Sequence, residues 1–312
     1  MERGNSTGVI EFVLLGLSQT QEIQLFLFVL FLIFYSMILP ANILIILTIR
    51  SDPHLGSPMY FFLANLAFLD ICYCSVTPPK MLADFFSRRK TISYGGCMAQ
   101  IFFIHFVGAS EVFLLIGMAF DRYVAICHPL RYANMMSREV CCALVGASWA
   151  VGFMHSILQV VLIIQVPFCG PNELDNFFCD ISQVIKLACT DVYVLELFMF
   201  FNSGLAILMC FLLLLISYGA LLVRLRAGDP SKGTSKAAST CVTHIIIVFI
   251  MFSPAIYIYC RPFRSFSLDK VVYVYHTVVF PLMNPIIYTL RNKEIISAMK
   301  RLLVRHGLCQ RK

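Results

Sequence analysis

The stretch IQLFLFVLFLIFYSMILPANILIILTI covers residues 23–49 and contains no Asp, Glu, Lys or Arg. Because a helix needs about 20 apolar residues to cross the hydrocarbon core of a bilayer, this stretch is long enough for one span. Four further uncharged blocks and two blocks with isolated charges have similar lengths, and together they lie at 58–81, 98–122, 140–164, 197–223, 237–260 and 271–290. The seven blocks predict an all-α membrane protein with a seven-transmembrane helix bundle.

The composition of the chain supports this prediction. Hydrophobic residues make up 59% and charged residues 13% of the 312 residues, against roughly 45–50% and 25% in an ordinary soluble domain. There is too little polar surface for a water-soluble enzyme or a disordered chain, and the blocks lack the alternation of a transmembrane β-barrel. The net charge of +7 is weak evidence for nucleic acid, and no such partner is expected. The lipid bilayer is the partner that these blocks require.

The charges between the blocks indicate the orientation. Glu2, Arg3 and Glu11 argue against a cleavable signal peptide. With the N-terminus outside, 15 Lys and Arg residues fall on the inner side and nine on the outer side, as the positive-inside rule requires. We therefore expect a multi-pass protein of the plasma membrane, with an extracellular segment at 1–22, a helical domain at 23–292 and a cytoplasmic tail at 293–312.

Two further features agree with an outer N-terminus. The tripeptide that begins at Asn5 is a glycosylation sequon, which is usable only in the lumen. Cys97, Cys169, Cys179 and Cys189 fall in segments assigned to the outside, where disulfides persist. Four cysteines allow three pairings, and the residues alone do not choose between them.

Two carboxylates lie inside the second and third blocks. Asp70 and Glu111 are costly in a bilayer and should face the bundle interior. They would repel each other unless one is protonated or a cation lies between them. One interpretation is a polar hub that holds a sodium ion, and the other is a neutral carboxyl bonded to helix backbone or to Asn284. No other cofactor or metal is expected.

The segment MAFDRYVAICHPLRY (118–132) ends the third block with Asp121, Arg122 and Tyr123. Together with four other motifs in the same order, it resembles the rhodopsin-like G-protein-coupled receptors and, within them, the olfactory (odorant) receptors. These four motifs are PMYFFLANLAFLDICY (58–73), SY (217–218), KAASTCVTH (236–244) and PLMNPIIYTLRN (281–292). One departure lies in the sixth block, where the usual Phe-Tyr-Gly is Met-Phe-Ser at 251–253.

The resemblance implies a receptor that activates a heterotrimeric G protein of the stimulatory, olfactory type and raises cyclic AMP. Asp121 would hold Arg122 at rest and release it toward the G protein and Tyr218 on activation, while Tyr288 moves inward. The implied switch consists of Asp121, Arg122, Tyr123, Tyr218, Asn284, Pro285 and Tyr288. The implied G-protein face is basic and includes Arg131, Arg138, Arg224, Arg226, Lys232 and Lys236.

The resemblance also implies two disulfides, Cys97–Cys179 between the third helix and the second outer loop and Cys169–Cys189 within that loop. Beyond Asn292, apolar residues alternate with basic ones over 293–304, which is typical of a short amphipathic eighth helix on the inner leaflet. Cys309 follows it and is a candidate for palmitoylation.

The resemblance implies a ligand pocket in the outer half of the bundle, under the second outer loop. Helical spacing predicts its walls: Ile104, His105, Gly108, Ala109 and Val112 on the third helix, Asn202, Ser203 and Ala206 on the fifth, Phe252, Ile256 and Tyr259 on the sixth, and Gln159, Val274 and Thr277 at the rim. Apolar walls with a few polar anchors are the usual pattern of a small-molecule site.

The chemistry of these residues favours a small neutral odorant. Ile104 stands where amine receptors of the superfamily carry an aspartate, so a cationic amine has no partner there. No Lys or Arg lies at mid-depth, so a carboxylate would be buried without compensation. Arg261 and Arg264 lie near the mouth, which keeps a receptor for carboxylic acids or another small metabolite as the alternative.

Three other functions fit the sequence less well than a receptor. A transporter would show an inverted repeat and paired helix interruptions, and the sequence has neither. A retinal pigment needs a lysine in the seventh block, and 271–290 contains none. A membrane enzyme is not expected, because His105, His155, His244 and His276 lie on different helices without the spacing of a metal centre.

Overall fold

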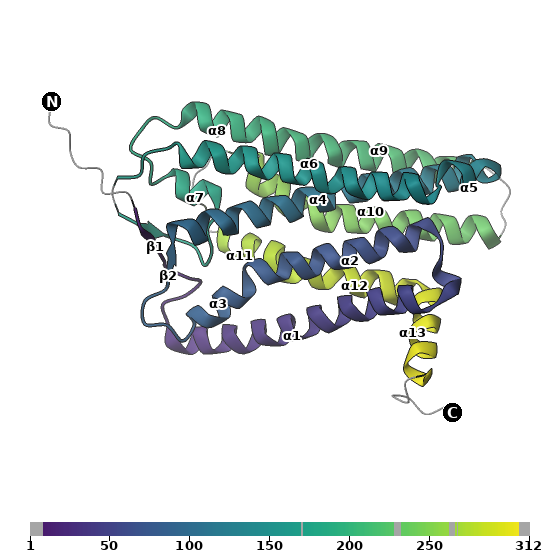
Figure 1. Ribbon diagram of the computed structural model, residues 1–312, viewed down its shortest axis with the longest axis horizontal. Helices are drawn as coiled ribbons and strands as arrows, with labels where there is room; N and C mark the ends of the chain where they lie inside the picture. Colours follow the sequence, from purple (N-terminus) through teal and green to yellow (C-terminus); the bar gives the residue numbers. More distant parts are fainter. Residues whose placement is uncertain (1–8, 170, 228–231, 262–265, 267, 306–312) are drawn as a thin grey trace.

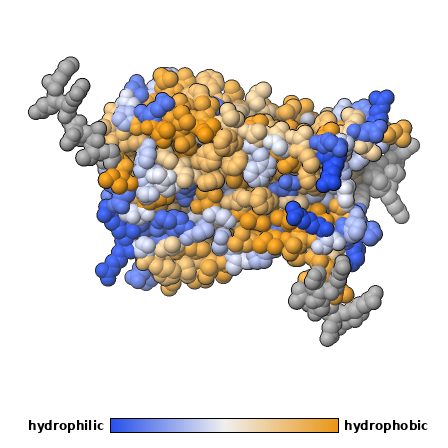
Figure 2. Space-filling model, in the orientation of Figure 1, coloured by the Kyte–Doolittle hydropathy of each residue, from blue (hydrophilic) through white to orange (hydrophobic). Residues whose placement is uncertain are grey.

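The computed structural model describes residues 9–169, 171–227, 232–261, 266 and 268–305, without the side chains of 232–234, 236, 288–291 and 305. Its long helices run side by side along one axis (Figure 1), and they are α1 (Gln21–Ser51), α2 (Pro58–Val76), α4 (Tyr94–Cys127), α6 (Arg138–Ile164), α9 (Ala206–Ala227) and α10 (Lys232–Tyr259). Six helical stretches in the described part are long and apolar enough to cross a membrane. Figure 2 shows hydrophobic residues along the flank and hydrophilic residues gathered toward the two ends.

The seventh span is continuous but changes its helical form. It consists of α11 (Asp269–Val274), the π-helical segment η4 (Tyr275–Val279) and α12 (Phe280–Arg291). The fifth span has the same design, with α8 (Tyr193–Met199) and the π-helical segment η3 (Phe200–Leu205) before α9. Single π-turns inside α-helices are frequent at functional sites. The chain is therefore an all-α membrane protein with seven helical spans.

Prolines divide the second span. Helix α2 ends at Val76, and α3 (Pro78–Asp84) follows after Thr77. Two consecutive prolines at 78 and 79 provide no backbone N–H, so the helical hydrogen bonds to the preceding turn are missing there, although Thr77 keeps helical backbone angles. The second span thus reaches Asp84, three residues beyond the predicted block.

The end of the bundle that carries the N-terminal strand is closed by a small sheet and the loop after α6. Strand β1 (Glu11–Leu14) pairs antiparallel with β2 (Thr91–Ser93) and parallel with β3 (Glu173–Leu174). The short helix α7 (Ile181–Ile185) follows, and all five of its residues are buried. The sequence pattern of the segment 1–22 does not predict strand β1.

The opposite end carries short elements and the eighth helix. They are η1 (Pro53–Leu55), η2 (Pro129–Arg131), α5 (Tyr132–Met135) and α13 (Lys293–Arg305). Helix α13 leaves the bundle at a steep angle (Figure 1), and its bounds agree with the amphipathic pattern over 293–304. Arg301 Nε donates to Asp52 Oδ2 at 2.9 Å and ties α13 to the end of α1.

Candidate functional site

A cavity of about 710 Å³ lies between α4, α6, η3, α9, α10 and η4. Its walls are mostly apolar, with polar side chains from each of the five spans that surround it. Ten of the predicted pocket residues line it, namely Ile104, His105, Gly108, Ala109, Val112, Asn202, Ser203, Ala206, Phe252 and Tyr259. The size suits one small molecule, since ligand pockets usually measure about 300–1,000 Å³.

The first polar group of the cavity joins α4 to α10. His105 Nδ1 faces the carbonyl oxygen of Ile101 at 2.8 Å, and its Nε2 lies 3.1 Å from the hydroxyl of Tyr259. With Nδ1 protonated and donating to this carbonyl, Nε2 is unprotonated and accepts from the tyrosine hydroxyl. The Tyr259 hydroxyl then has its two lone pairs free to accept from a ligand.

The second polar group joins α6 to the π-helical segment η3. Gln159 Nε2 donates to Ser203 Oγ at 2.6 Å and lies 2.8 Å from His155 Nε2. The other ring nitrogen of His155 lies 3.3 Å from Asn202 Nδ2. His155 lines the cavity and was not predicted. Its position four residues before Gln159 on one helix face was the signal that would have identified it.

Four predicted residues do not line this cavity, and their contacts show why. The side chain of Gln159 is fully buried in its hydrogen bonds to α6 and η3. Thr277 turns back to donate to the carbonyl of Tyr273 at 2.7 Å. Ile256 and Val274 pack instead against the main hydrophobic core. The cavity wall includes Met251, Ala255 and His276 from the same two spans.

The charged groups around the cavity are few. Glu111 lines it, and its Oε1 is buried without a hydrogen-bond partner. Arg261 lies near the mouth but donates to Asp269 Oδ1 at 2.5 Å, and it stacks 4.4 Å from the ring centres of Tyr257 and Phe266. Arg264 lies outside the described residues. The guanidinium of Arg261 is therefore already neutralised.

The predicted switch lies at the inner end of α4. Arg122 Nε donates to Asp121 Oδ2 at 2.8 Å, and the Tyr132 hydroxyl donates to Asp121 Oδ1 at 2.7 Å. Burial, followed by the bond to Asp121, raises the pKa of Tyr132, so this phenol stays a donor. The Tyr123 side chain is exposed next to this pair.

The other switch residues belong to α9 and α12. The Tyr218 hydroxyl is buried on α9 and lies 2.9 Å from His244 Nδ1 on α10. Pro285 follows Asn284 inside α12, and the side chain of Tyr288 lies outside the described part. Asp121, Arg122 and Tyr218 therefore occupy the same end of the bundle.

The two intramembrane carboxylates have different surroundings. Asn284 Nδ2 donates to both oxygens of Asp70, at 3.0 and 3.1 Å, which is the arrangement that the alternative to a sodium site requires. Asn284 Oδ1 and Glu111 Oε1 are nevertheless buried without a hydrogen-bond partner. Two uncompensated oxygens beside a carboxylate are suitable ligands for a small cation.

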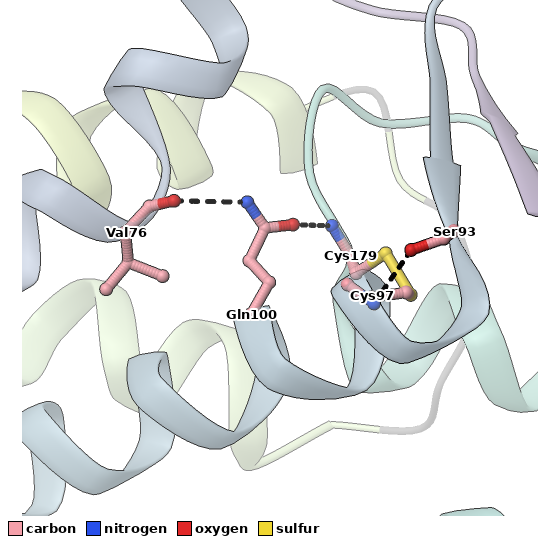
Figure 3. Close-up of a disulfide and its surroundings, with 6 residues drawn as sticks. Val76, Ser93, Cys97, Gln100 and Cys179 are labelled. Carbon is pink, nitrogen blue, oxygen red and sulfur yellow. Dashed lines mark hydrogen bonds between the residues drawn. A yellow bond between two sulfur atoms is a disulfide. The ribbon is translucent and has the colours of Figure 1, made fainter.

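The structure contains both disulfides, Cys97–Cys179 and Cys169–Cys189. Figure 3 shows the first one beside Gln100, whose Oε1 accepts from the backbone N–H of Cys179 at 2.8 Å and whose Nε2 donates to the carbonyl of Val76 at 3.4 Å. The disulfide and this glutamine fix the loop after α6 to α2 and α4. The sequon at Asn5 and the cysteine at 309 lie outside the described residues.

The chain is similar to known proteins over its whole length. The profile of the family described as olfactory receptor matches residues 31–306. Olfactory receptor 4M1 of Mus musculus is 63% identical over 313 aligned residues, which cover 100% of both chains. Olfactory receptor 4M1 of Homo sapiens is 62% identical with the same coverage. Olfactory receptor 4N4C of Homo sapiens is 59% identical over 99% of this chain and 98% of its own.

Proposed function

Because the chain belongs to the olfactory receptor family of membrane receptors that couple to G proteins, we propose that it binds a small neutral odorant in the cavity between α4, α6, α9 and α10. Binding would activate a stimulatory, olfactory-type G protein and raise cyclic AMP. A receptor of this family is not an enzyme, so the cavity has to recognise a molecule and not transform it. The proposal concerns the chemistry of that molecule and the signal that follows.

The observation that carries the proposal is the charge balance of the cavity. Its lining in the described part includes no Lys or Arg, and the nearby Arg261 is paired with Asp269. A carboxylic acid would have to be buried there without a cation, facing Glu111 across an apolar space. This argues against the alternative ligand class, the acids. An amine is the second candidate, because Glu111 supplies one carboxylate to the wall.

The polar anchors of the cavity support a ligand with one oxygen. The Tyr259 hydroxyl can accept from a ligand hydroxyl while it keeps its bond to His105, and it can donate to a carbonyl if it exchanges that bond. Asn202 can do the same from the opposite wall, where it is only half-buried. Alcohols, aldehydes, ketones and esters have one or two such groups on an apolar body, which matches the walls.

Two accessory sites belong to the proposal. Asn5 would carry a glycan on the outer side. A sodium ion would lie beside Asp70 and Glu111, supported by the two buried oxygens without a partner, Glu111 Oε1 and Asn284 Oδ1. The residues that would hold the ion are Asp70, Glu111 and Asn284, and the ion would offset one of the two carboxylate charges and so reduce their repulsion. We expect basal signalling to differ between sodium and potassium media in the wild type, and this difference to be absent in Glu111→Gln.

The test of the ligand class is a dose–response screen in cells that report cyclic AMP. Neutral alcohols, aldehydes, ketones and esters are compared with acids and amines. We expect activation by at least one neutral class. For that agonist, Tyr259→Phe should cost about 1 kcal/mol, roughly a fivefold rise in EC50, and His105→Leu should cost more because it also removes the ring that holds the tyrosine.

Tyr257→Phe is the matched control for this test. Tyr257 lies two residues before Tyr259 on α10, its hydroxyl reaches Asp269, and it does not line the cavity. Its EC50 should stay at the wild-type value. Activation by acids or amines alone would overturn the neutral class. Wild-type potency in both Tyr259→Phe and His105→Leu would overturn the site.

A further inference from the structure

The wall that α6 contributes to the cavity is also part of the outer surface of the protein. Met154 is 63% exposed and Leu158 is 42% exposed, although both line the cavity. The same is true of a whole stripe at helical spacing, formed by Ala150, Val151, Met154, Ile157, Leu158 and Val161. On the other side of the gap, Ala206 of α9 is exposed and lines the cavity as well. In a bilayer, these side chains face hydrocarbon, so the cavity opens sideways between α6 and α9.

The opening exists because each flanking helix is held by a different neighbour. A Cβ atom on Gly152 would lie 2.2 Å from Ser110 Oγ and 2.6 Å from the Phe106 carbonyl, so α6 approaches α4 more closely than any side chain permits. Ser156 strengthens this contact by donating to the Phe102 carbonyl of α4 at 2.5 Å. Helix α6 therefore leans on α4.

The segment η3 is held to the opposite neighbour. A Cβ atom on Gly204 would lie 2.3 Å from the carbonyl oxygen of Tyr259, and the Cys260 thiol donates to the Gly204 carbonyl at 3.2 Å. These contacts draw the fifth span toward α10 and away from α6. Two hydrogen bonds still connect α6 to η3, one from Gln159 to Ser203 and one between His155 and Asn202.

The route from the extracellular side is obstructed by the loop after α6. Phe177, Phe178 and Cys179 are each at most 3% exposed. Tyr273 of α11 donates to the buried carboxylate of Asp180 at 2.8 Å. Together with the disulfide of Figure 3 and the ion pair between Lys270 and Asp175 at 2.7 Å, these contacts join the loop to α4 and to the seventh span.

We propose that the opening between α6 and α9, which we call the lateral portal, is the access route by which neutral apolar molecules dissolved in the bilayer reach the cavity. The class of ligand rests on the proposed function, while the route rests on the exposed stripe and on the closed loop. Molecules of this class leave water for hydrocarbon, so the bilayer is where they accumulate before binding. The rim of the portal is apolar, so passage requires no desolvation of charge.

The probe for this route is a phosphatidylcholine with a photoreactive diazirine midway along one acyl chain. It cannot leave the bilayer, so it reaches the cavity wall only through a lateral opening. The receptor in nanodiscs containing this lipid is illuminated, and the labelled residues are located by peptide mass spectrometry. We expect label on Gly108 and Val112 of the cavity wall in addition to Leu213, which is 53% exposed on the lipid face of α9.

Two methionine substitutions provide the matched comparison. Met154 at the portal is 63% exposed, and Met209 on α9 is 61% exposed but does not line the cavity. Met154→Trp should reduce labelling of Gly108 and Val112 severalfold, whereas Met209→Trp should leave it unchanged. Leu213 should be labelled equally in all samples, which controls for folding and lipid contact. If Met154→Trp fails to fold, Leu158→Trp carries the same prediction.

Label confined to Leu213 in the wild type would overturn the portal. Equal labelling of Gly108 and Val112 in the two tryptophan variants would overturn it as well. Because photolabelling records access and not signalling, a failure of the proposed function is seen separately, as an absence of cyclic AMP in the odorant screen.

Discussion

The substitution Asp121→Asn removes the negative charge from the inner end of α4 while it keeps the size of the side chain. Asp121 accepts from the guanidinium of Arg122 and from the hydroxyl of Tyr132, and its side chain is 1% exposed against 18% for Arg122. The bonds therefore lie largely out of water, where they are screened weakly. An asparagine can still accept through one oxygen, but it does not form an ion pair.

The magnitude follows from the loss of charge. Hydrogen bonds to charged groups contribute roughly 1.5–3 kcal/mol each, so weakening the pair destabilises the resting state by about that amount, which is roughly 10- to 150-fold in the equilibrium between the two states. An active state populated at about 1% without ligand would rise to roughly 10–60%. Active conformations in which Arg122 is released from Asp121 are not destabilised by the substitution, so their population rises.

The assay is cyclic AMP accumulation without odorant, normalised to receptor at the cell surface. Glu139→Gln is the control. Glu139 is an exposed carboxylate at the start of α6, so its substitution removes the same charge from the same side of the membrane. Basal cyclic AMP should rise in Asp121→Asn and stay at the wild-type level in Glu139→Gln. Equal basal signals in Asp121→Asn and wild type at matched surface expression would refute the resting lock.

Two further predictions concern stability. Hydrogen bonds from Arg301, and then from His54, lower the pKa of Asp52 from 3.8 to about 2, so the stabilisation is complete above pH 4 and is lost only as the pH falls toward 2. Protection factors for hydrogen exchange in α13, which correct for the intrinsic effect of pH, should thus be constant between pH 6 and pH 8 but lower throughout that range in Asp52→Asn. The Cys97–Cys179 disulfide closes a loop of 82 residues and the Cys169–Cys189 disulfide closes one of 20. Because the longer loop loses more entropy on closure, Cys97→Ser should destabilise the receptor by about 1 kcal/mol more than Cys169→Ser. Equal melting temperatures of the two variants in nanodiscs would contradict this.

The sequence predicts the spans well because a helix that crosses the bilayer needs about 20 consecutive apolar residues. The first apolar block becomes α1 with ends within two residues of those expected, and the amphipathic pattern after Asn292 becomes α13. The family motifs likewise predict both disulfides through matched positions. The second span extends three residues beyond the expected block, because Lys80 and Asp84 form an ion pair one helical turn apart that keeps both charges at the end of the span.

The closed outer end was not predicted, because it depends on contacts between distant segments. Strand β1 has a short, ordinary sequence, and it forms only where β2 and β3 supply partners from two other loops. A strand of four residues has no strong pattern of its own. The buried loop around Phe177 and Phe178 likewise depends on Tyr273, which is about 95 positions away along the chain and packs against Phe178 with ring centres 5.2 Å apart.

Helical spacing predicted the cavity residues of α4 because one helix face is periodic. It could not show that α6 leans on α4, since that depends on Gly152 meeting Ser110 across two helices. The consequence is that α6 contributes an entire stripe to the cavity wall, while the sequence had suggested only Gln159 from that span. Sequence reasoning missed Met154 and His155 as cavity residues because it could not predict the close approach of α6 to α4.

Helix α10 connects the cavity to the switch in a way that explains how a small ligand can matter. Tyr259 lies at its outer end against His105, and His244 lies 15 residues earlier against Tyr218, about 22 Å away at 1.5 Å per residue. Pro254 lies between them inside the helix and weakens the backbone at that point, where helices bend most readily. A ligand that takes the Tyr259 hydroxyl from His105 changes the balance of forces on the outer half of α10. It shifts the equilibrium only as far as its affinity differs between the two positions of that half.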